Sequence, residues 1–528
     1  MAVQLALLCV VACMTGVGSA QAATYYVACD TGRDANDGLS ELRPWQSAAK
    51  VATFPFLNGD VVFFKKGCRW EDVSIKISKS LHFGAYGEGS SPPQLLGSRR
   101  ASAWTKIDFR GVFVTEAALE QGVPSRREIL IVHDDKNGRF YSRTGSLDSV
   151  DAPGKFFHDV PGSRLYVFPL PDVDLSRNLH IASKPHVLEF QRTDVERVVV
   201  DGLSLSFANE YAIGFWYQSS GTNNGSLTVS NCSFFGNAYQ AIHIGGTNTF
   251  QEVDILKNTV TANGNEAFYI RYLKRNEEGE VIKRLLRISG NTIGGQGFGW
   301  RSEGPESAAN GDGIDIKAGV AAAVIDHNMV FDVAGMYGIG VQSSNVLIEH
   351  NTVGNIRMWN APPETSVAGI FVDPYDSKGT VVVRNNKVAV SGANGIVIRG
   401  DATRRPAVEI YENDIAVEAP YFAVAFTSQN VTNTVIRNNR IKGGQAALFF
   451  MKPCCPPSHV EIHDNDFRGM AAPFVTAQDL SAGVRFYSNS FCFSGLVDPA
   501  YAHKLAGNAV SSGCEVIQPQ PPQGILVK

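Results

Sequence analysis

Hydrophobic and polar positions follow one short pattern along the second half of the chain. An apolar residue is followed by two variable residues, an asparagine, another variable residue and a second apolar residue. The asparagines of the nine copies are Asn258, Asn291, Asn328, Asn351, Asn386, Asn413, Asn439, Asn465 and Asn489. Two earlier copies keep the frame with Leu203 and Cys232 at the asparagine position. A period of about 25 residues is typical of stacked supersecondary units.

A second pattern precedes the asparagine pattern: a glycine or alanine, then apolar residues at alternate positions, as in 313–316, 369–372 and 395–398. Alternation with a period of two predicts short strands, and the lack of a 3.6-residue period argues against helical repeats. Each unit should contain one strand at the Gly/Ala pattern, one that enters the asparagine and one that leaves it. The asparagine suits a tight turn because it tolerates a left-handed backbone and can bond backbone groups. We therefore predict an all-β parallel solenoid with an internal asparagine ladder.

These repeats resemble the right-handed parallel β-helix proteins of the pectate-lyase-like superfamily. The resemblance covers about residues 24–100 and 186–495, and the opening string at 36–40 and 57–63 is similar to that of secreted β-helix proteins acting on polysaccharides. It implies a right-handed parallel β-helix and a polysaccharide-active protein. It does not specify the reaction, because one scaffold hosts many chemistries.

The chain divides into five predicted segments. These are a signal peptide at 1–22, an N-terminal cap with the first coils at 23–100, an inserted antiparallel β-subdomain at 101–185, the helix with its groove at 186–515, and a flexible tail at 516–528. Ala20-Gln21-Ala22 is a cleavage signal, so we expect a secreted or periplasmic protein. The sequence around Cys13 also looks like a lipobox, which leaves a lipoprotein as the alternative. No later segment is long and apolar enough to span a membrane.

Charge and cysteine content narrow the range of partners. The net charge of −4 argues against a nucleic-acid partner, and we expect a monomer. Cys29 and Cys68 are placed to staple the N-terminal cap in an oxidising compartment. Cys232 occupies a ladder position and should be a buried free thiol. No cysteine or histidine grouping has the spacing of a zinc site.

Outward-facing positions of the Gly/Ala strands should form two columns, with neighbours about 4.8 Å apart on successive coils. The first column contains His243, Tyr269 and Asp315, and the second contains Arg271, Lys317, Gln342, Asp373 and Arg399. Long insertions beside them carry Trp300 and Trp359. This set suits an acidic polysaccharide, because cations pair with uronate carboxylates and tryptophans stack on sugar rings. The alternative is that these charged side chains are simply solvated on an outer strand face and have no function.

The segment 310–317 resembles a strand of β-helix polysaccharide lyases that ends in a catalytic lysine. The resemblance implies Lys317 as the base that removes a proton beside the uronate carboxylate. A lysine can act in this way only if its neighbours lower its pKa, a role that Arg271 could fill. Gln342 stands where one lyase subfamily has an arginine acid, so Tyr269 or Arg399 could supply the proton. Asp312 and Asp315 are alternatively a Ca²⁺ site.

A second motif, at 373–376, reads Asp-Pro-Tyr-Asp and resembles an element of alginate C5-epimerases. Tyr375 replaces the histidine of that family. Pro374 should end the strand and expose Asp373 and Asp376.

Three classes of function remain open. The leading hypothesis is a secreted lyase that cleaves an acidic polysaccharide by β-elimination, with Lys317, Tyr269, Asp315 and Asp373 as candidate catalytic residues and with Arg271, His243, Gln342, Arg399, Trp300, Trp359 and Asp376 as candidate substrate ligands. The second is a glycoside hydrolase in which Asp315 and Asp373 form the acid–base pair, with a spacing that suits inversion. The third is a non-catalytic carbohydrate-binding surface protein or a C5-epimerase. Beyond the possible Ca²⁺ we expect no cofactor.

Overall fold

The computed structural model describes residues 22–107, 111–117, 119, 128–190, 195–217, 223–246, 249–271, 285–297, 311–317, 319–320, 322–358, 362–363, 365–374, 379–400, 407–427, 431–450, 458–476, 483–495 and 499–514. The predicted signal peptide and tail lie outside these residues, apart from Ala22. Trp300, Trp359, Tyr375 and Asp376 also lie outside them.

Three long parallel sheets, here named A, B and C, run along the molecule, and successive coils add strands to them. Sheet A consists of β1 (Thr24–Val27), β2 (Val61–Lys65), β5 (His82–Tyr86), β17 (Arg197–Asp201), β20 (Asn223–Ser230), β23 (Thr249–Leu256), β26 (Leu285–Ser289), β29 (Ala322–Asp326), β32 (Val346–Glu349), β35 (Thr380–Arg384), β38 (Ala407–Tyr411), β41 (Thr432–Arg437), β44 (Ser458–His463) and β47 (Val484–Tyr487). These strands enter the asparagine turn.

Sheet B leaves that turn. It consists of β3 (Arg69–Trp70), β6 (Gln94–Leu96), β18 (Ser204–Ser206), β21 (Ser233–Phe235), β24 (Thr259–Thr261), β27 (Thr292–Gln296), β30 (Met329–Ala334), β33 (Thr352–Arg357), β36 (Lys387–Val390), β39 (Asp414–Val417), β42 (Arg440–Gly443), β45 (Asp466–Met470), β48 (Ser490–Phe493) and β49 (Ala509–Ser512).

Sheet C carries the Gly/Ala pattern. It consists of β4 (Ile75–Ile77), β16 (His186–Phe190), β19 (Tyr211–Tyr217), β22 (Ile242–Gly246), β25 (Phe268–Ile270), β28 (Ile314–Ile316), β31 (Tyr337–Val341), β34 (Ala368–Val372), β37 (Asn394–Ile398), β40 (Phe422–Phe426), β43 (Ala446–Phe450) and β46 (Ala472–Thr476). The predicted three strands per unit are therefore present, and the prediction of a right-handed parallel β-helix is confirmed.

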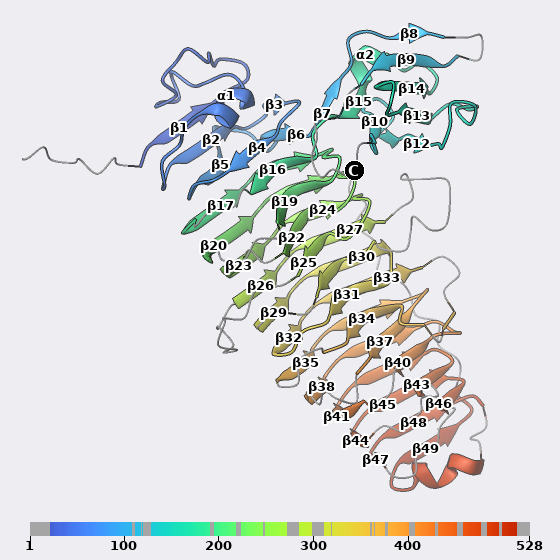
Figure 1. Ribbon diagram of the computed structural model, residues 1–528. Coiled ribbons are helices and arrows are strands. Elements are labelled where there is room, and N and C mark those ends of the chain that lie inside the picture. Colours follow the sequence, from blue (N-terminus) through green and yellow to red (C-terminus); the bar gives the residue numbers. More distant parts are fainter. Residues whose placement is uncertain are drawn as a thin grey trace, which may run out of the picture.

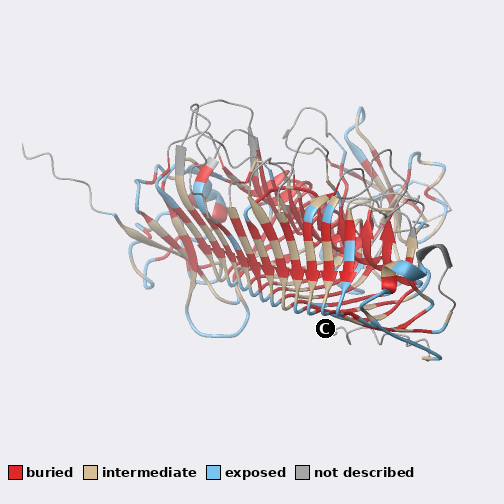
Figure 2. Ribbon diagram, turned by 90° about the horizontal axis from the view of Figure 1, so that it is seen from below, coloured by how far each residue is buried: buried red, intermediate tan, exposed pale blue. Residues whose placement is uncertain are grey.

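The coils stack along one axis from β1 to β48 (Figure 1). Equivalent apolar residues pair from coil to coil, as in Ile288 with Ile325 and Ile325 with Ile348. Their side chains are fully buried and form one continuous core inside the solenoid, visible as the buried band in Figure 2. Removing this apolar surface from water stabilises the stack by about 25 cal/mol per Å².

The asparagine ladder is present and extends one coil beyond the predicted copies, to Asn508. Each ladder Oδ1 accepts the backbone N–H of the preceding ladder residue, as in Asn351 N to Asn386 Oδ1 at 3.0 Å. Each Nδ2 donates to a carbonyl of sheet A and to the next Oδ1. One detail of the sequence argument is wrong: the left-handed backbone belongs to the residue before each asparagine, for example Asn385 at φ 53°. The ladder side chain itself supplies the hydrogen bonds.

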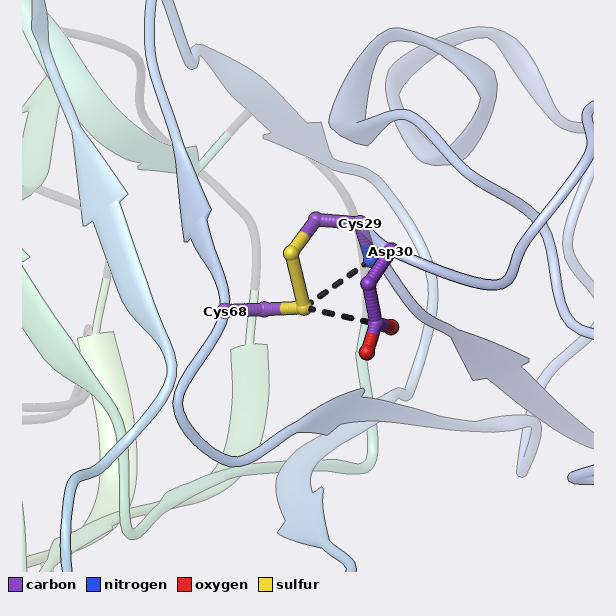
Figure 3. A group of neighbouring side chains, drawn as sticks. All are labelled: Cys29, Asp30 and Cys68. Carbon is purple, nitrogen blue, oxygen red and sulfur yellow. Dashed lines mark hydrogen bonds between the residues drawn. A yellow bond between two sulfur atoms is a disulfide. The ribbon is translucent and has the colours of Figure 1, made fainter.

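Both ends of the solenoid carry a disulfide bond. Cys29–Cys68 joins the first coils, as predicted, with Asp30 beside it (Figure 3). Because both sulfur atoms are covalently joined, this group cannot also bind a metal as thiolates. The short helix α1 (Ala48–Thr53) lies between the two cysteines along the chain. At the other end, Cys492–Cys514 ties β48 to the residues that follow β49, beyond the short helix η2 (Pro499–Leu505). Cys232 is a buried free thiol, as predicted.

Two small sheets form a lobe beside the first coils (Figure 1). The four-stranded sheet contains β11 (Arg139–Phe140), β10 (Val132–Asp134), β15 (Leu179–Ala182) and β7 (Ser98–Arg100). The five-stranded sheet contains β12 (Ser142–Arg143), β13 (Lys155–Asp159), β14 (Arg164–Phe168), β9 (Phe113–Glu116) and β8 (Thr105–Lys106). With α2 (Leu175–Asn178) they enclose a second hydrophobic core. Most of the pairing is antiparallel, but β12 pairs with β13 in parallel.

An ionic cluster connects this lobe to the first coils. Asp135 Oδ2 lies 3.0 Å from Arg69 Nη1 and 2.9 Å from His180 Nε2. The hydrogen bonds and charges of His133, His180 and Arg69 outweigh burial and hold the pKa of Asp135 well below its usual range. Among the described helices, none has the length and apolar character that crossing a membrane requires.

Candidate functional site

The two columns of sheet C lie in the register that the repeat predicts. His243 pairs with Tyr269, and Tyr269 pairs with Asp315. The second column continues the ladder by backbone hydrogen bonds in which the N–H groups of Arg271, Lys317, Gln342, Asp373 and Arg399 donate to the preceding coil at 2.7–2.8 Å. The predicted candidates among the described residues therefore share one face of the solenoid.

Part of this face is not exposed, and here the sequence interpretation is wrong. Asp315 retains 1 % of its accessible surface and His243 retains 5 %. Tyr211, His243 and Tyr269 stack on one another, with centroids 4.3 and 4.9 Å apart. Further along, Phe371 belongs to an apolar cluster on the same face. Aromatic and apolar neighbours in the same register position cover one another, so an outward direction does not guarantee contact with solvent.

Lys317 forms an ion pair with Asp315, with 2.6 Å between Nζ and Oδ2. The charge of Asp315 and its hydrogen bond outweigh burial and raise the pKa of Lys317 above its ordinary value. The expectation of a lysine with a lowered pKa is therefore wrong. A lysine held as ammonium has no lone pair with which to remove a proton, so its role as the base loses its physical support.

Arg271, the other predicted cation on this part of the face, lies beside Tyr269. Its side chain hydrogen-bonds to Tyr269. Burial raises the pKa of the Tyr269 hydroxyl in spite of the opposing effects of Arg271 and Lys317. Tyr269 is consequently a protonated phenol at neutral pH, held between two cations, since the Lys317 ammonium lies 5.9 Å from its ring centroid.

Three buried carboxyl groups meet below Lys317. One oxygen each from Glu266, Asp312 and Asp315 lies within 4.8 Å of the others. Burial, followed by the charges of neighbouring carboxylates, raises the pKa of Glu266 to about 7 and the pKa of Asp312 well above its ordinary value. Burial likewise raises the pKa of Asp315, against the attraction of Lys317. One ammonium cannot compensate three carboxylates in a buried site, so protons remain in the cluster at neutral pH.

Backbone and amide donors fix two of these carboxyls. Asp312 Oδ1 accepts the N–H groups of Met336 and Tyr337 at 2.7 and 2.8 Å. Gln240 Nε2 donates to Glu266 Oε2. Asp315 has no comparable donor: among the described residues its only partner is the Lys317 ammonium. Both of its oxygens are buried, and the described residues supply no further hydrogen bond to them.

Tyr337 connects the carboxyl cluster to the next predicted acid, Asp373. Its ring stacks on Phe371 at 4.2 Å, and the charges of Asp312, Asp315 and Asp373 add to burial in raising its pKa. Asp373 Oδ2 lies 3.7 Å from Arg399 Nε, and the Asp373 side chain is 9 % exposed. Asp315 and Asp373 lie two coils apart, about 9.6 Å along the axis at about 4.8 Å per coil.

Glu266, Gln240 and Tyr337 are absent from the sequence-based list of site residues. Each occupies the position directly before the Gly/Ala pattern, as does Asp312. A search of that position would have found a run of polar residues on consecutive coils. Of the remaining predictions, Trp300, Trp359 and Asp376 lie outside the described residues.

The Ca²⁺ hypothesis for Asp312 and Asp315 stays a prediction. Buried carboxylates within 4.8 Å of one another are a plausible set of oxygen ligands. However, the Lys317 ammonium already provides a positive charge at Asp315. The test is whether a chelator changes the thermal midpoint or the activity.

We expect Glu266 to make the protein less stable as the pH rises from 4.5 to 7. Its pKa is raised from 4.5 to about 7 on folding, so in this window the folded state binds more protons than the unfolded state. The free energy of unfolding then falls with pH, by about 3 kcal/mol at most. Urea unfolding at pH 4.5 and pH 7 should show a smaller fall in Glu266→Gln than in the wild type. The exposed control Glu41→Gln should behave as the wild type, and an equal fall in both variants would contradict the assignment.

Residues 211–415 match the family model of a right-handed β-helix region. The fold and this match define the chain as a right-handed parallel β-helix protein. No curated protein matches it.

The chain is similar to several solved structures. One is described as the complex of XylC with xylose (12 % identity, 93 % of this chain and 82 % of that chain covered, TM-score 0.41). Another is the GH136 lacto-N-biosidase of Eubacterium ramulus (14 %, 94 % and 68 %, TM-score 0.38). A third is a tailspike protein of E. coli bacteriophage HK620 in complex with a pentasaccharide (10 %, 86 % and 61 %, TM-score 0.29). At this level of similarity no reaction can be transferred to this chain.

Proposed function

We propose that this protein is a secreted carbohydrate-active enzyme that hydrolyses glycosidic bonds in an acidic polysaccharide. The observation that carries the proposal is a buried carboxyl, Asp315, whose pKa is raised and whose only described ionic partner is Lys317, two coils from a second carboxyl, Asp373. Glycoside hydrolysis requires one carboxyl that donates a proton and one that is ionised.

Asp315 is the general acid in this proposal. Burial raises the pKa of Asp315 above its ordinary value, the direction that favours the protonated form that a general acid needs. Lys317 sits at 2.6 Å and stabilises the carboxylate that remains after the transfer. Glu266 and Asp312 each place a carboxyl oxygen within 4.8 Å of Asp315, and burial raises the pKa of both, which favours bound protons beside the acid.

Asp373 is the general base that activates water. Arg399 lies beside it and favours the ionised form by its positive charge. Inverting enzymes separate their carboxyls by about 6.5–9.5 Å, which leaves room for the attacking water. Asp315 and Asp373 lie two coils apart, about 9.6 Å along the axis, with a further offset of two residues along the strands because Asp315 is in register with Phe371. This spacing is closer to that of inverting enzymes than to the separation of about 5–5.5 Å in retaining enzymes, so inversion at the anomeric carbon is expected.

The substrate class follows from the cations on the same face. Arg271 is exposed, Lys317 keeps 25 % of its side-chain surface and Arg399 keeps 49 %. Guanidinium groups bind carboxylates in a bidentate manner, so uronate residues suit them. Secretion is supported by two disulfide bonds, which persist in oxidising compartments.

A panel of acidic polysaccharides tests the reaction. We expect the wild type to release reducing ends without the ultraviolet absorbance of unsaturated uronates, and nuclear magnetic resonance should show the inverted anomer first. Release that is always accompanied by that absorbance would instead establish β-elimination. If the protein binds a polymer but releases no product from any of them, it is a carbohydrate-binding protein without catalytic activity.

A lyase is the second candidate, and one observation favours it. Tyr269 is a protonated phenol hydrogen-bonded to Arg271 and close to Lys317, an arrangement able to neutralise a uronate carboxylate and protonate a leaving oxygen. A lyase also needs a base to remove a proton from the uronate, and Lys317 cannot be that base while it is an ammonium ion. In Lys317→Ala, a lyase that uses this lysine as its base would lose all elimination.

A further inference from the structure

A cavity of about 560 Å³ lies in the lobe, away from the carboxyl cluster of sheet C. Its lining comes from both small sheets: β7 of the four-stranded sheet, and β8, β9 and β14 of the five-stranded sheet. Ligand pockets in proteins are typically about 300–1,000 Å³. The cavity is therefore large enough for a small ligand or for part of a polymer.

Two arginines give this cavity its charge. Arg99 on β7 and Arg164 on β14 both line it, and neither forms an ion pair with any residue that the structure describes. Glu116, whose Cα pairs with that of Arg164 across the sheet, contributes one carboxylate. Two guanidinium groups against one carboxylate leave a net positive lining.

Hydroxyl groups complete the lining at Ser102, Thr105 and Thr115. A hydroxyl both donates and accepts, and a carboxylate accepts from neighbouring sugar hydroxyls. The combination of two guanidinium groups, one carboxylate and several hydroxyls matches a ligand that carries an anionic group on a polyhydroxylated ring. A purely anionic ligand such as a phosphate would gain nothing from Glu116, which repels it.

We propose that this cavity is an accessory binding site for a uronate residue of an acidic saccharide. Arg99 and Arg164 bind the uronate carboxylate, and Glu116 with the three hydroxyls binds the ring hydroxyls. The site would hold polymer on the lobe while the sheet C site acts on another part of the chain, which raises the effective concentration of substrate. The inference rests on the proposed substrate class but not on the proposed reaction.

Calorimetric titration of the full chain tests the site. Asp315→Asn serves as the background so that no substrate is consumed, and trigalacturonate and trimannuronate are the probes. Adding Arg99→Ala and Arg164→Ala should weaken binding of at least one trimer tenfold or more. The matched control is Arg177→Ala, an exposed arginine of the same lobe that does not line the cavity, and it should bind as the background does. Thermal midpoints verify that all variants are folded.

The outcomes of this titration either support the lobe site or overturn it. The site is supported if trimer affinity falls in the Arg99→Ala/Arg164→Ala variant but not in Arg177→Ala, and if the neutral methyl-esterified trimer binds weakly. Unchanged affinity in the double variant overturns it, as does the absence of binding by either trimer. Equal affinity for inorganic sulfate would reveal an anion site without sugar recognition and would also overturn it. If Asp315→Asn retains full activity, the proposed reaction fails, but binding in the lobe is unaffected.

Discussion

Asp315→Asn should lower the turnover number on the active polysaccharide by about 10²–10⁴-fold, the usual contribution of a general acid. The amide fills the same space beside Lys317 but cannot donate a proton to a departing oxygen. The loss should largely disappear on an aryl glycoside of the same sugar, because a good leaving group departs without protonation. Initial rates on both substrates measure the effect.

The control and the partner variant sharpen this test. Asp414→Asn changes a carboxyl on sheet B and should leave both rates unchanged. Asp373→Asn should lose activity on both substrates, because the attacking water still needs a base. An Asp315→Asn enzyme that is equally impaired on the aryl glycoside would refute the acid role and point to binding. An unimpaired enzyme would remove Asp315 from the reaction.

Asn386→Ala should destabilise the fold by about 2–6 kcal/mol. Its Oδ1 accepts the buried N–H of Asn351, and its Nδ2 donates to the buried carbonyl of Ile348. Alanine leaves both groups without a partner, and each buried unsatisfied group costs about 1–3 kcal/mol. Urea unfolding followed by circular dichroism should show the lower midpoint, starting in the coils that contain residues 348–413.

Lys387→Ala is the matched control, because it changes the next residue, which is exposed. Surface substitutions of this kind usually stay within about 0.5 kcal/mol. A similar loss in both variants would show that the region is sensitive to any change. A loss below 1 kcal/mol in Asn386→Ala would mean that water replaces the amide, and the ladder would then not be a main source of stability.

The solenoid could be predicted because its signal is repeated. Each asparagine or Gly/Ala pattern is weak alone, but recurrence fixed the strands, the register and the sharing of one face by Lys317 and Asp373. Local chemistry also identified the Cys29–Cys68 pair and the buried thiol of Cys232. These properties depend on spacing along the chain, which a sequence displays directly.

The candidate site was predicted only in outline, for physical reasons. Register places Asp315 above sheet C, but whether solvent reaches it depends on rings such as Tyr269 and Tyr337 that lie over neighbouring strands. The charge state of Lys317 depends on a 2.6 Å contact with a residue two positions away. The contribution of Glu266 comes from an adjacent coil, 46 residues before Asp312, and no local pattern reports that distance.

The cross-links at the two extremities have a consequence for where this molecule can persist. Each coil of a solenoid contacts only the coils next to it along the axis. Unfolding can therefore begin at the terminal coils, which have a neighbour on one side only. Cys29–Cys68 and Cys492–Cys514 clamp those outermost turns. Reduction of both disulfides by thiols should therefore allow the solenoid to unfold from its two ends, and the central coils should unfold last.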